Sequence, residues 1–407
     1  MPKKRGNREG TIGRRKDGVW YASILIGRDP ATGKLKRAWF YGSTRQEVAA
    51  KLAKAQGELQ TGTFVEPTKV TLGQWLDTWL NEYAKPHIRP TTYQMYEYLC
   101  RVHLKPALGQ IPLKSLRPEQ IQAFYNSKRE AGRVNLRKGS SPSLSARTVN
   151  IMHGILRRAL KQAVKVGLVA RNVTDAVSPP RQQRREIRVL TPEEQARFLA
   201  VLDRHRLGPA FLLILATGLR RGEALALRWS DLDLAAGVAN ISRSLVEVRD
   251  RSKPKGERLT LVFQEPKSRS GRRTVPIPKG VVAALKAHKA RQAEEKLFMG
   301  GKYEDNDLVF ATETGGPVHP RHFDEILRSL LKEAGVEPRG VHALRHSFAT
   351  RLLEAGEHPK VVQEILGHSQ VSLTLDIYSH VSMDLKRRAA EKMDEILKTE
   401  KRASHKD

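Results

Sequence analysis

Four short stretches in the second half of the chain contain residue types that bind and activate a phosphate group. In the first, Arg220 follows Gly218, where an apolar helix is predicted to end, and Glu223 stands one helical turn further on. A guanidinium beside the unpaired N–H groups of a helix start is a good anion clamp, and a carboxylate three residues later can hold it. An ordinary surface ion pair is the alternative interpretation.

The second and third stretches add a lysine, a histidine and another arginine. A hairpin is predicted between Val262–Lys267 and Arg273–Ile277, and from it the Lys267 ammonium could reach a phosphate or a leaving oxygen. Taken alone, Lys267 could equally be a solvated hairpin residue. His342 and Arg345 share one face of a predicted helix, because they are three residues apart, and can donate to the same anion.

The fourth stretch combines a histidine with a tyrosine. Pro359–Leu366 is predicted to be a helix that ends at Gly367, which places His368 on the following turn. Tyr378 follows in a short apolar segment, where a packed tyrosine with a hydrated hydroxyl is the alternative.

Together these stretches resemble the tyrosine recombinase (phage integrase) family over roughly residues 185–390. The family's pattern of Arg, Lys, His-x-x-Arg, His or Trp, and Tyr matches Arg220, Lys267, His342, Arg345, His368 and Tyr378. The short sequence motifs around these residues match the family as well: Thr-Gly-Leu-Arg, Leu-Arg-His-Ser-Phe-Ala-Thr, Leu-Gly-His and Tyr-Ser-His.

The resemblance implies a role for each of these side chains. The two arginines would bind the non-bridging oxygens of a scissile phosphate, and the histidines would supply further hydrogen bonds or proton transfer. Lys267 would protonate the departing 5′-oxygen, and Tyr378 would become a 3′-phosphotyrosine. Because each step keeps the bond energy in an ester, no ATP, metal or other cofactor is expected.

The expected fold class is a multidomain, mainly α protein. It combines a small three-stranded sheet plus helix, a helical domain, and an α+β catalytic domain. In the helical domain, apolar residues recur at helical spacing: Met152, Ile155, Leu156, Ala159, Leu160 and Ala163. Strands are predicted at Thr11–Arg15, Val19–Ile26 and Leu35–Tyr41, and a helix follows from the Thr44 capping box to about Gln60. The boundaries that we predict are 1–66 for a domain similar to arm-type DNA-binding domains, 70–176 for a helical core-binding (SAM-like) domain, 177–188 for a linker, 189–390 for the catalytic domain, and 391–407 for a tail.

Basic and aromatic side chains outside the catalytic stretches are candidates for DNA contact. Arg37, Trp39 and Tyr41 share one face of the third predicted strand, and such a face can lie in a DNA groove. Packing of these aromatic rings in a core is the alternative. Further candidates are Arg147, Arg181, Arg184 and Arg185.

The charge of the chain indicates its partner. Lys and Arg number 73 against 43 Asp and Glu, a formal net charge of +30, which favours a polyanion such as nucleic acid. Cys100 is the one cysteine, so an internal disulfide and a cysteine zinc site are excluded. The chain contains no apolar run long enough to span a membrane and no secretory signal, so we expect a location in the bacterial cytoplasm, with the nucleoid, and no membrane partner.

The resemblance also implies the assembly. Double-stranded DNA with core and arm-type attachment sites would be the partner, bound by a homotetramer. An excisionase-like directionality factor and a host DNA-bending protein are candidate helpers. Two other functions stay open: a type IB topoisomerase-like enzyme that only relaxes DNA, and a non-catalytic architectural DNA-binding protein.

Overall fold

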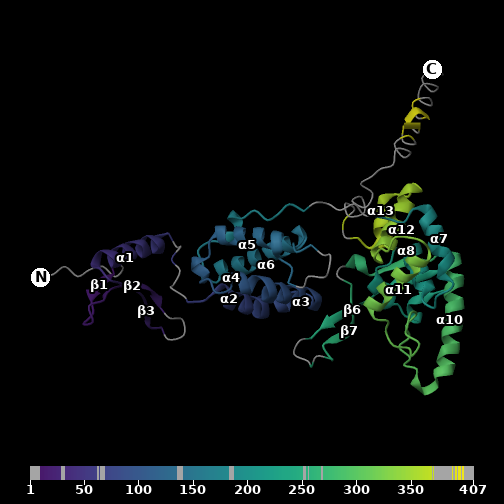
Figure 1. The fold of residues 1–407 in the computed structure, drawn as a ribbon, viewed down its shortest axis with the longest axis horizontal. Coiled ribbons are helices and arrows are strands. Elements are labelled where there is room, and N and C mark those ends of the chain that lie inside the picture. The colour runs from purple at the N-terminus through teal and green to yellow at the C-terminus, as the bar shows by residue number, and fades with distance from the viewer. Residues whose placement is uncertain are drawn as a thin grey trace. The chain divides into compact units, whose positions relative to one another are not determined.

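The computed structural model describes residues 10–28, 33–61, 64, 69–134, 141–182, 188–250, 254, 256–266, 269–368, 370, 387, 390–391, 393–395 and 397. The chain divides into two compact units, 1–184 and 185–407 (Figure 1). Helices predominate and the sheets are small and antiparallel, which confirms the predicted fold class. Within the described ranges, no helix is both long and apolar enough to cross a bilayer.

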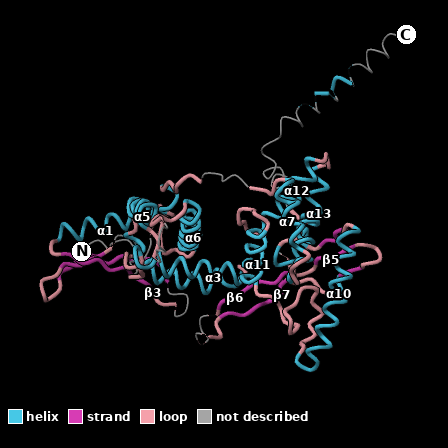
Figure 2. The backbone as a smooth tube through the Cα atoms, turned by 45° about the vertical axis from the view of Figure 1, so that its right-hand side comes forward, coloured by secondary structure: helices cyan, strands magenta, loops and turns pink. Residues whose placement is uncertain are grey.

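The first unit opens with a three-stranded antiparallel sheet in the order β1–β2–β3. Its strands are β1 (Thr11–Arg14), β2 (Trp20–Arg28) and β3 (Leu35–Gly42). Helix α1 (Arg45–Gln60) packs against β2 and β3 (Figure 2). The buried core that they share is Ala22, Ile24, Ala38, Val48 and Leu52. The predicted strands and helix are therefore confirmed, with small shifts at their ends.

The start of α1 forms only half of the predicted capping box. The Thr44 hydroxyl accepts from the backbone N–H of Glu47 at 3.2 Å, as expected. The Glu47 carboxylate, however, accepts from the N–H of Ser43 at 2.9 Å and from the Lys51 ammonium at 2.7 Å. A lysine one turn along the helix supplies a charged donor, and the carboxylate turns to it.

Helices with short links make up the rest of the first unit. They are α2 (Leu72–Thr78), α3 (Pro90–Leu99), α4 (Lys105–Leu108), α5 (Pro118–Ala131) and α6 (Ala146–Lys165), with π-helical segments at Trp79–Ala84 and Cys100–Leu104 and single 3₁₀ turns at Lys85–His87, Leu113–Ser115 and Val173–Ala176. The predicted apolar stripe of α6 is buried throughout: Met152, Ile155, Leu156, Ala159, Leu160 and Ala163. The Trp75 indole donates to the Ala159 carbonyl at 2.8 Å and so ties α2 to this stripe.

The second unit is built around the apolar helix α8. Its helices are α7 (Pro192–Leu202), α8 (Gly208–Thr217), α9 (Arg221–Leu225), α10 (Lys279–Met299), α11 (Pro320–Glu333), α12 (His342–Glu354) and α13 (Pro359–Leu366), with 3₁₀ turns at Trp229–Asp231, Arg269–Gly271 and Gly300–Lys302. Helices α7, α10 and α12 all contact α8, and Phe211 of α8 stacks on Phe323 of α11 at 4.3 Å between ring centroids. This packing brings the third candidate stretch, on α12, beside the first.

The strands of the second unit pair differently from the sequence prediction. They are β4 (Leu232–Asp233), β5 (Val238–Ile241), β6 (Ser244–Arg249), β7 (Leu259–Gln264) and β8 (Arg273–Pro276). The predicted hairpin of Val262–Lys267 with Arg273–Ile277 is wrong, because β7 pairs with β6 and β8 pairs with β5. Pairing with β5 buries Val275 beside Ala239, both without exposed surface, whereas β7 stays partly exposed in its local hairpin. Burial of apolar surface therefore decides the partner of β8.

Candidate active site

Two constraints require glycine at the turn between α8 and α9. Gly218 ends α8 in the left-handed conformation, with φ of 66°, and its N–H donates to the Ile214 carbonyl. A Cβ atom there would lie 2.5 Å from Leu366 and 2.6 Å from Phe348. The tight turn sets Arg220 as the residue before the first turn of α9, as the sequence predicted.

Glu223 holds Arg220 in the way that the sequence predicted, but the contact is buried rather than on the surface. The Glu223 side chain is only 3% exposed, and its Oε1 accepts from Arg220 Nη1 at 2.7 Å. Its Oε2 accepts from the Arg220 backbone N–H at 3.0 Å. Glu223 therefore occupies the backbone N–H of Arg220. The Arg220 side chain, which is 38% exposed, remains the group that can bind an anion.

A second arginine completes the surroundings of Glu223. Arg273, at the start of β8, donates to Glu223 Oε2 from Nη2 at 2.9 Å and to Oε1 from Nη1 at 3.3 Å. Burial raises the pKa of Glu223, yet the hydrogen bonds and charges of Arg273 and Arg220 outweigh it and hold that pKa below its usual value. Glu223 is therefore an ionised carboxylate shared by two guanidinium groups.

Arg345 is the most deeply buried of the predicted catalytic residues that the structure describes. It is 3% exposed and donates to the Gly218 carbonyl at 2.5 Å and the Leu366 carbonyl at 2.7 Å. Burial, and then the neighbouring Arg220, lower its pKa to about 9, against the opposing effect of Glu223. Even so, the guanidinium stays protonated at neutral pH.

Three arginines meet at the C-terminal end of α13. The consecutive carbonyls of residues 365–367 each accept from a different arginine: Ile365 from Arg273 at 2.5 Å, Leu366 from Arg345 at 2.7 Å, and Gly367 from Arg220 at 3.3 Å. The last carbonyls of a helix lack intrahelical donors and carry the negative end of its dipole, so cations bind there. This helix end therefore gathers both predicted phosphate-binding arginines at one place.

His368 lies directly after this helix end. Gly367 ends α13 with φ of 64°, as predicted, and Gln363 donates to the His368 carbonyl at 2.9 Å. Burial and then the charges of Arg345 and Arg220 lower the pKa of His368 to about 4. The ring is therefore neutral at pH 7 when no anion is bound, and it can accept or donate a hydrogen bond.

A similar environment surrounds the histidines of α12. His342 keeps an exposed surface, but partial burial, Arg345 and Arg221 lower its pKa. Burial lowers the pKa of His346 to about 4, and its Nδ1 has no hydrogen-bond partner among the described residues. The rings of His342 and His346 are 6.4 Å apart between centroids. The sequence analysis did not single out His346.

The structure therefore brings together four of the six residues predicted for catalysis, together with Glu223. Lys267 and Tyr378 lie outside the described residues. Arg273 was missed as part of the cluster, although the sequence carries a signal for it. Residues 273, 275 and 277 share one face of a strand, and Val275 and Ile277 are apolar, so an inward-pointing arginine there needs a buried partner.

The candidate DNA-contact residues of the first unit are exposed where the structure describes them. Trp39 and Tyr41 are 48% and 49% exposed, and Arg37 is exposed on the same face of β3. The alternative that these rings form a core is wrong, since Ala38 on the opposite face is the residue packed beneath α1. Tyr21 of β2 adds a ring 5.6 Å from that of Trp39.

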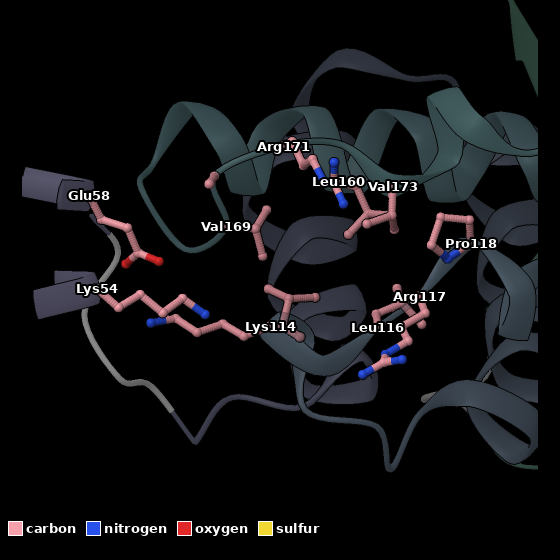
Figure 3. Close-up of a pocket in the computed structure, with 12 residues that line it drawn as sticks. Lys54, Glu58, Lys114, Leu116, Arg117, Pro118, Leu160, Val169, Arg171 and Val173 are labelled. Atoms are coloured by element: carbon pink, nitrogen blue, oxygen red, sulfur yellow. The ribbon is translucent and has the colours of Figure 1, made fainter. Parts of the chain in front are cut away.

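The remaining basic candidates are scattered. Arg147, in the first turn of α6, and Arg181 are both exposed, and Arg184 and Arg185 lie outside the described residues. A hollow of about 610 Å³ in the first unit contains none of them. Figure 3 shows its lining by Leu116, Leu160, Val169, Lys114, Arg117 and Arg171.

Comparison with known proteins defines the class to which this site belongs. The model of the phage integrase family matches residues 188–384, and that of the phage integrase N-terminal SAM-like domain matches residues 71–129. A tyrosine recombinase XerC-like protein of Caldanaerobacter subterraneus subsp. tengcongensis is 33% identical over 384 residues, covering 92% of this chain and 95% of its own. The ICEBs1 integrase of Bacillus subtilis is 25% identical, covering 94% and 98%.

Solved structures show the same fold. An integrase of the Tn1549 transposon, in complex with a circular intermediate DNA, aligns with a TM-score of 0.64 at 24% identity, over 80% of this chain and 99% of its own. A lambda integrase dimer bound to a core site aligns with a TM-score of 0.51 at 20% identity, over 92% and 96%. The chain belongs to the phage integrase family and is a tyrosine recombinase, a site-specific DNA strand-transfer enzyme.

Proposed function

We propose that this recombinase cleaves and rejoins DNA through a covalent bond between Tyr378 and a 3′-phosphate, and that it integrates and excises a mobile element. One observation carries the proposal: Arg220 and Arg345 donate to adjacent carbonyls, those of Gly367 and Leu366, with His368 next in the chain. Two guanidiniums and a neutral imidazole beside one helix end suit the oxygens of a single phosphodiester.

The proposed cleavage exchanges one ester for another. The Tyr378 oxygen attacks phosphorus, the bond from phosphorus to the 5′-oxygen breaks, and the 3′-phosphate remains on the tyrosine. Arg220 and Arg345 stabilise the negative charge that develops on the non-bridging oxygens. Lys267 supplies the proton to the departing 5′-oxygen.

A proton must also leave the tyrosine hydroxyl, whose ordinary pKa is about 10. The lowered pKa values of His342 and His368 leave neutral imidazoles, either of which can take up this proton as the Tyr378 oxygen bonds to phosphorus. Rejoining is the reverse reaction with a new 5′-hydroxyl, so the number of phosphodiester bonds is conserved. The cycle therefore needs no ATP, and in this proposal the two arginines and Lys267 supply the charge and the proton that a metal ion would otherwise supply.

We assign roles to the other parts of the chain by the same reasoning. Residues 70–176 would bind the core site together with the catalytic domain at 189–390, joined by the linker at 177–188. Residues 1–66 would bind arm-type sites through the exposed face of β3. A lambda integrase tetramer bound to a Holliday junction, at 21% identity and a TM-score of 0.52, supports a tetramer on DNA here as well. A directionality factor, a DNA-bending protein and action in the bacterial cytoplasm complete the proposal.

A nicked suicide substrate tests the covalent step. The protein should form an adduct that survives denaturation, and Tyr378→Phe should bind the same DNA but form none. Tyr303→Phe is the matched control, because Tyr303 precedes the buried stretch 308–311 and lies among acidic and basic side chains away from the cluster. Adduct formation by Tyr378→Phe at the normal rate would remove Tyr378 from its role.

Two further readouts separate the alternatives. Joining of two duplexes distinguishes recombination from the relaxation that a topoisomerase-like enzyme would perform. Cleavage in the presence of EDTA is expected to be unchanged, and complete loss on chelation would contradict the metal-free mechanism.

A further inference from the structure

We infer that Arg273 is a positioning residue for the reaction, which balances the charge of Glu223 so that Arg220 stays available to the scissile phosphate. The inference rests on the proposed role of Arg220. It concerns a residue that contacts neither the phosphate nor the tyrosine in the proposed mechanism.

The first observation is the uneven division of Glu223 between two arginines. Arg273 is 7% exposed and contacts both carboxylate oxygens, from Nη1 and Nη2. Arg220 is 38% exposed and gives its side chain to one oxygen only, from Nη1. Arg273 is thus the main side-chain partner of the carboxylate, while part of the Arg220 guanidinium faces outward.

The second observation is how completely Arg273 is engaged. Its Nε donates to the Ile365 carbonyl at 2.5 Å, and Nη1 also donates to the Gly271 carbonyl at 3.2 Å. One side chain therefore connects the start of β8, Glu223 of α9, and the end of α13. A Cβ atom on Gly367 would lie 3.1 Å from this guanidinium, so the fit beneath the helix end is close.

The electrostatic consequence follows from the burial of Glu223. A buried carboxylate must be paired, and with a single partner it would draw the whole Arg220 guanidinium toward itself. With Arg273 present, the three arginines and one carboxylate leave two net positive charges beside residues 365–367. These positive charges can then bind a phosphodiester and stabilise the extra negative charge of its transition state, without competition from Glu223.

Single-turnover cleavage of the nicked substrate by the full-length protein tests this inference. Arg273→Met should lower the cleavage rate about 10- to 100-fold, the range typical of residues that orient a catalytic group. The dissociation constant for the same DNA should change less than about twofold, since Arg273 is buried and contacts no phosphate in the proposed mechanism. Arg273→Lys keeps the charge but has one donor group in place of a fork, so its rate should lie in between.

The decisive measurement combines Arg273→Met with Glu223→Gln. In the otherwise wild-type protein, Glu223→Gln should lower the cleavage rate, because the positive charge of Arg273 beside Arg220 is then no longer neutralised. In the Arg273→Met background the same change should raise the rate about fivefold or more, because no buried charge then competes for Arg220. A structural role would also be relieved by removal of the unpaired carboxylate, so the folded fraction of each variant is measured by its melting curve, and the gain in rate must persist per folded molecule.

An exposed ion pair provides the matched control. Arg321 and Glu325 are paired at 3.0 Å on α11, with 81% and 46% of their side chains exposed. Arg321→Met, Glu325→Gln and their combination should each cleave within about twofold of wild type.

The possible results distinguish failure of the inference about Arg273 from failure of the proposed function. Wild-type cleavage by Arg273→Met, or a further loss on adding Glu223→Gln, would overturn the inference even if Tyr378→Phe behaves as proposed. Absence of any wild-type adduct would instead overturn the proposed function. If melting curves show that Arg273→Met does not fold, two other variants decide the question. Arg273→Lys must cleave more slowly than wild type, and the double variant, which has no unpaired buried carboxylate, must cleave faster than Glu223→Gln alone.

Discussion

The exposed face of β3 and the arginine cluster beside α13 are both candidate DNA-binding surfaces, yet they are built in opposite ways. On β3, Trp39 and Tyr41 are about half exposed above a core of five buried residues. In the cluster, Arg345 is 3% exposed and the Glu223 side chain 3%, next to the large core around α8. One surface displays its side chains to solvent, whereas the other holds them by hydrogen bonds to buried backbone.

This difference determines how the two surfaces respond to substitution. Side chains on β3 share few partners, so their effects on DNA affinity should add, without affecting folding. The arginines of the cluster share one carboxylate and three consecutive carbonyls, so their effects should be coupled and should reach both chemistry and stability. Three substitutions test that contrast in order of decreasing effect, and a pH series follows them.

Arg345→Ala should have the largest effect. Cleavage should fall about 1000-fold through loss of a transition-state contact. The second unit should lose about 3 kcal/mol of unfolding free energy, because the carbonyls of Gly218 and Leu366 lose their donor. Suicide-substrate kinetics and urea unfolding measure the two losses. A drop in the cleavage rate with an unchanged free energy of unfolding would contradict the view that Arg345 contributes to both catalysis and stability.

Ile24→Ala should unfold the sheet without disturbing the cluster. Ile24 is 1% exposed, and its truncation should cost about 2–4 kcal/mol, a large share of what so small a core can supply. Hydrogen exchange should accelerate in β2 and α1 while α8 and α12 remain protected. Leu35→Ala, at a position 56% exposed, is the control with no expected change. Equal acceleration in both units would show that they unfold together.

Trp39→Ala should weaken DNA binding and leave the stability of the protein nearly unchanged. Loss of an exposed ring from a DNA-facing strand should reduce affinity for an arm-type duplex by about 1 kcal/mol, with stability changed by less than about 0.5 kcal/mol. Fluorescence anisotropy and thermal unfolding provide the two measurements. Unchanged affinity for every arm-type duplex tested would remove this face of β3 from the proposed interface.

Acidification should act selectively on the second unit. The pKa values of His288, His346 and His368 are lowered to about 4, against about 6.5 in an unfolded chain. Between these values the unfolded chain binds more protons, so the stability of the second unit should fall as pH drops from 6.5 toward 4.

The sheet supplies the internal comparison for this pH dependence. Residues 10–61 contain no histidine, so their stability should stay level between pH 7 and 5. His346→Gln should flatten the slope of melting temperature against pH for the second unit. An unchanged slope in that variant would mean that the pKa of His346 in the folded protein is close to its value in the unfolded chain.

Local sequence patterns were sufficient to predict many of the helices and strands and much of the candidate site. Period-2 and helical spacing predicted the three strands of the sheet and the buried stripe of α6. Local geometry also predicted the contact of Glu223 with Arg220 and the glycine ends of α8 and α13. The assignments of Lys267 and Tyr378 remain predictions, since both lie outside the described residues.

Non-local pairing accounts for what the sequence did not reveal. Alternation showed that β3 has two faces, but only the packing of α1 on Ala38 decided that Trp39 faces solvent. The predicted hairpin failed because β8 pairs with β5, a partner from a separate stretch that buries Val275. No local rule predicts which of several apolar strands will provide the best burial.

The residue types and their order therefore determined the family, the chemistry and the candidate nucleophile, because reaction chemistry requires particular functional groups in particular local settings. Tertiary structure alone decided that three arginines from distant segments share the end of α13 and that Arg273 balances Glu223. A buried charge needs a partner, and which one it receives depends on the packing of the whole domain.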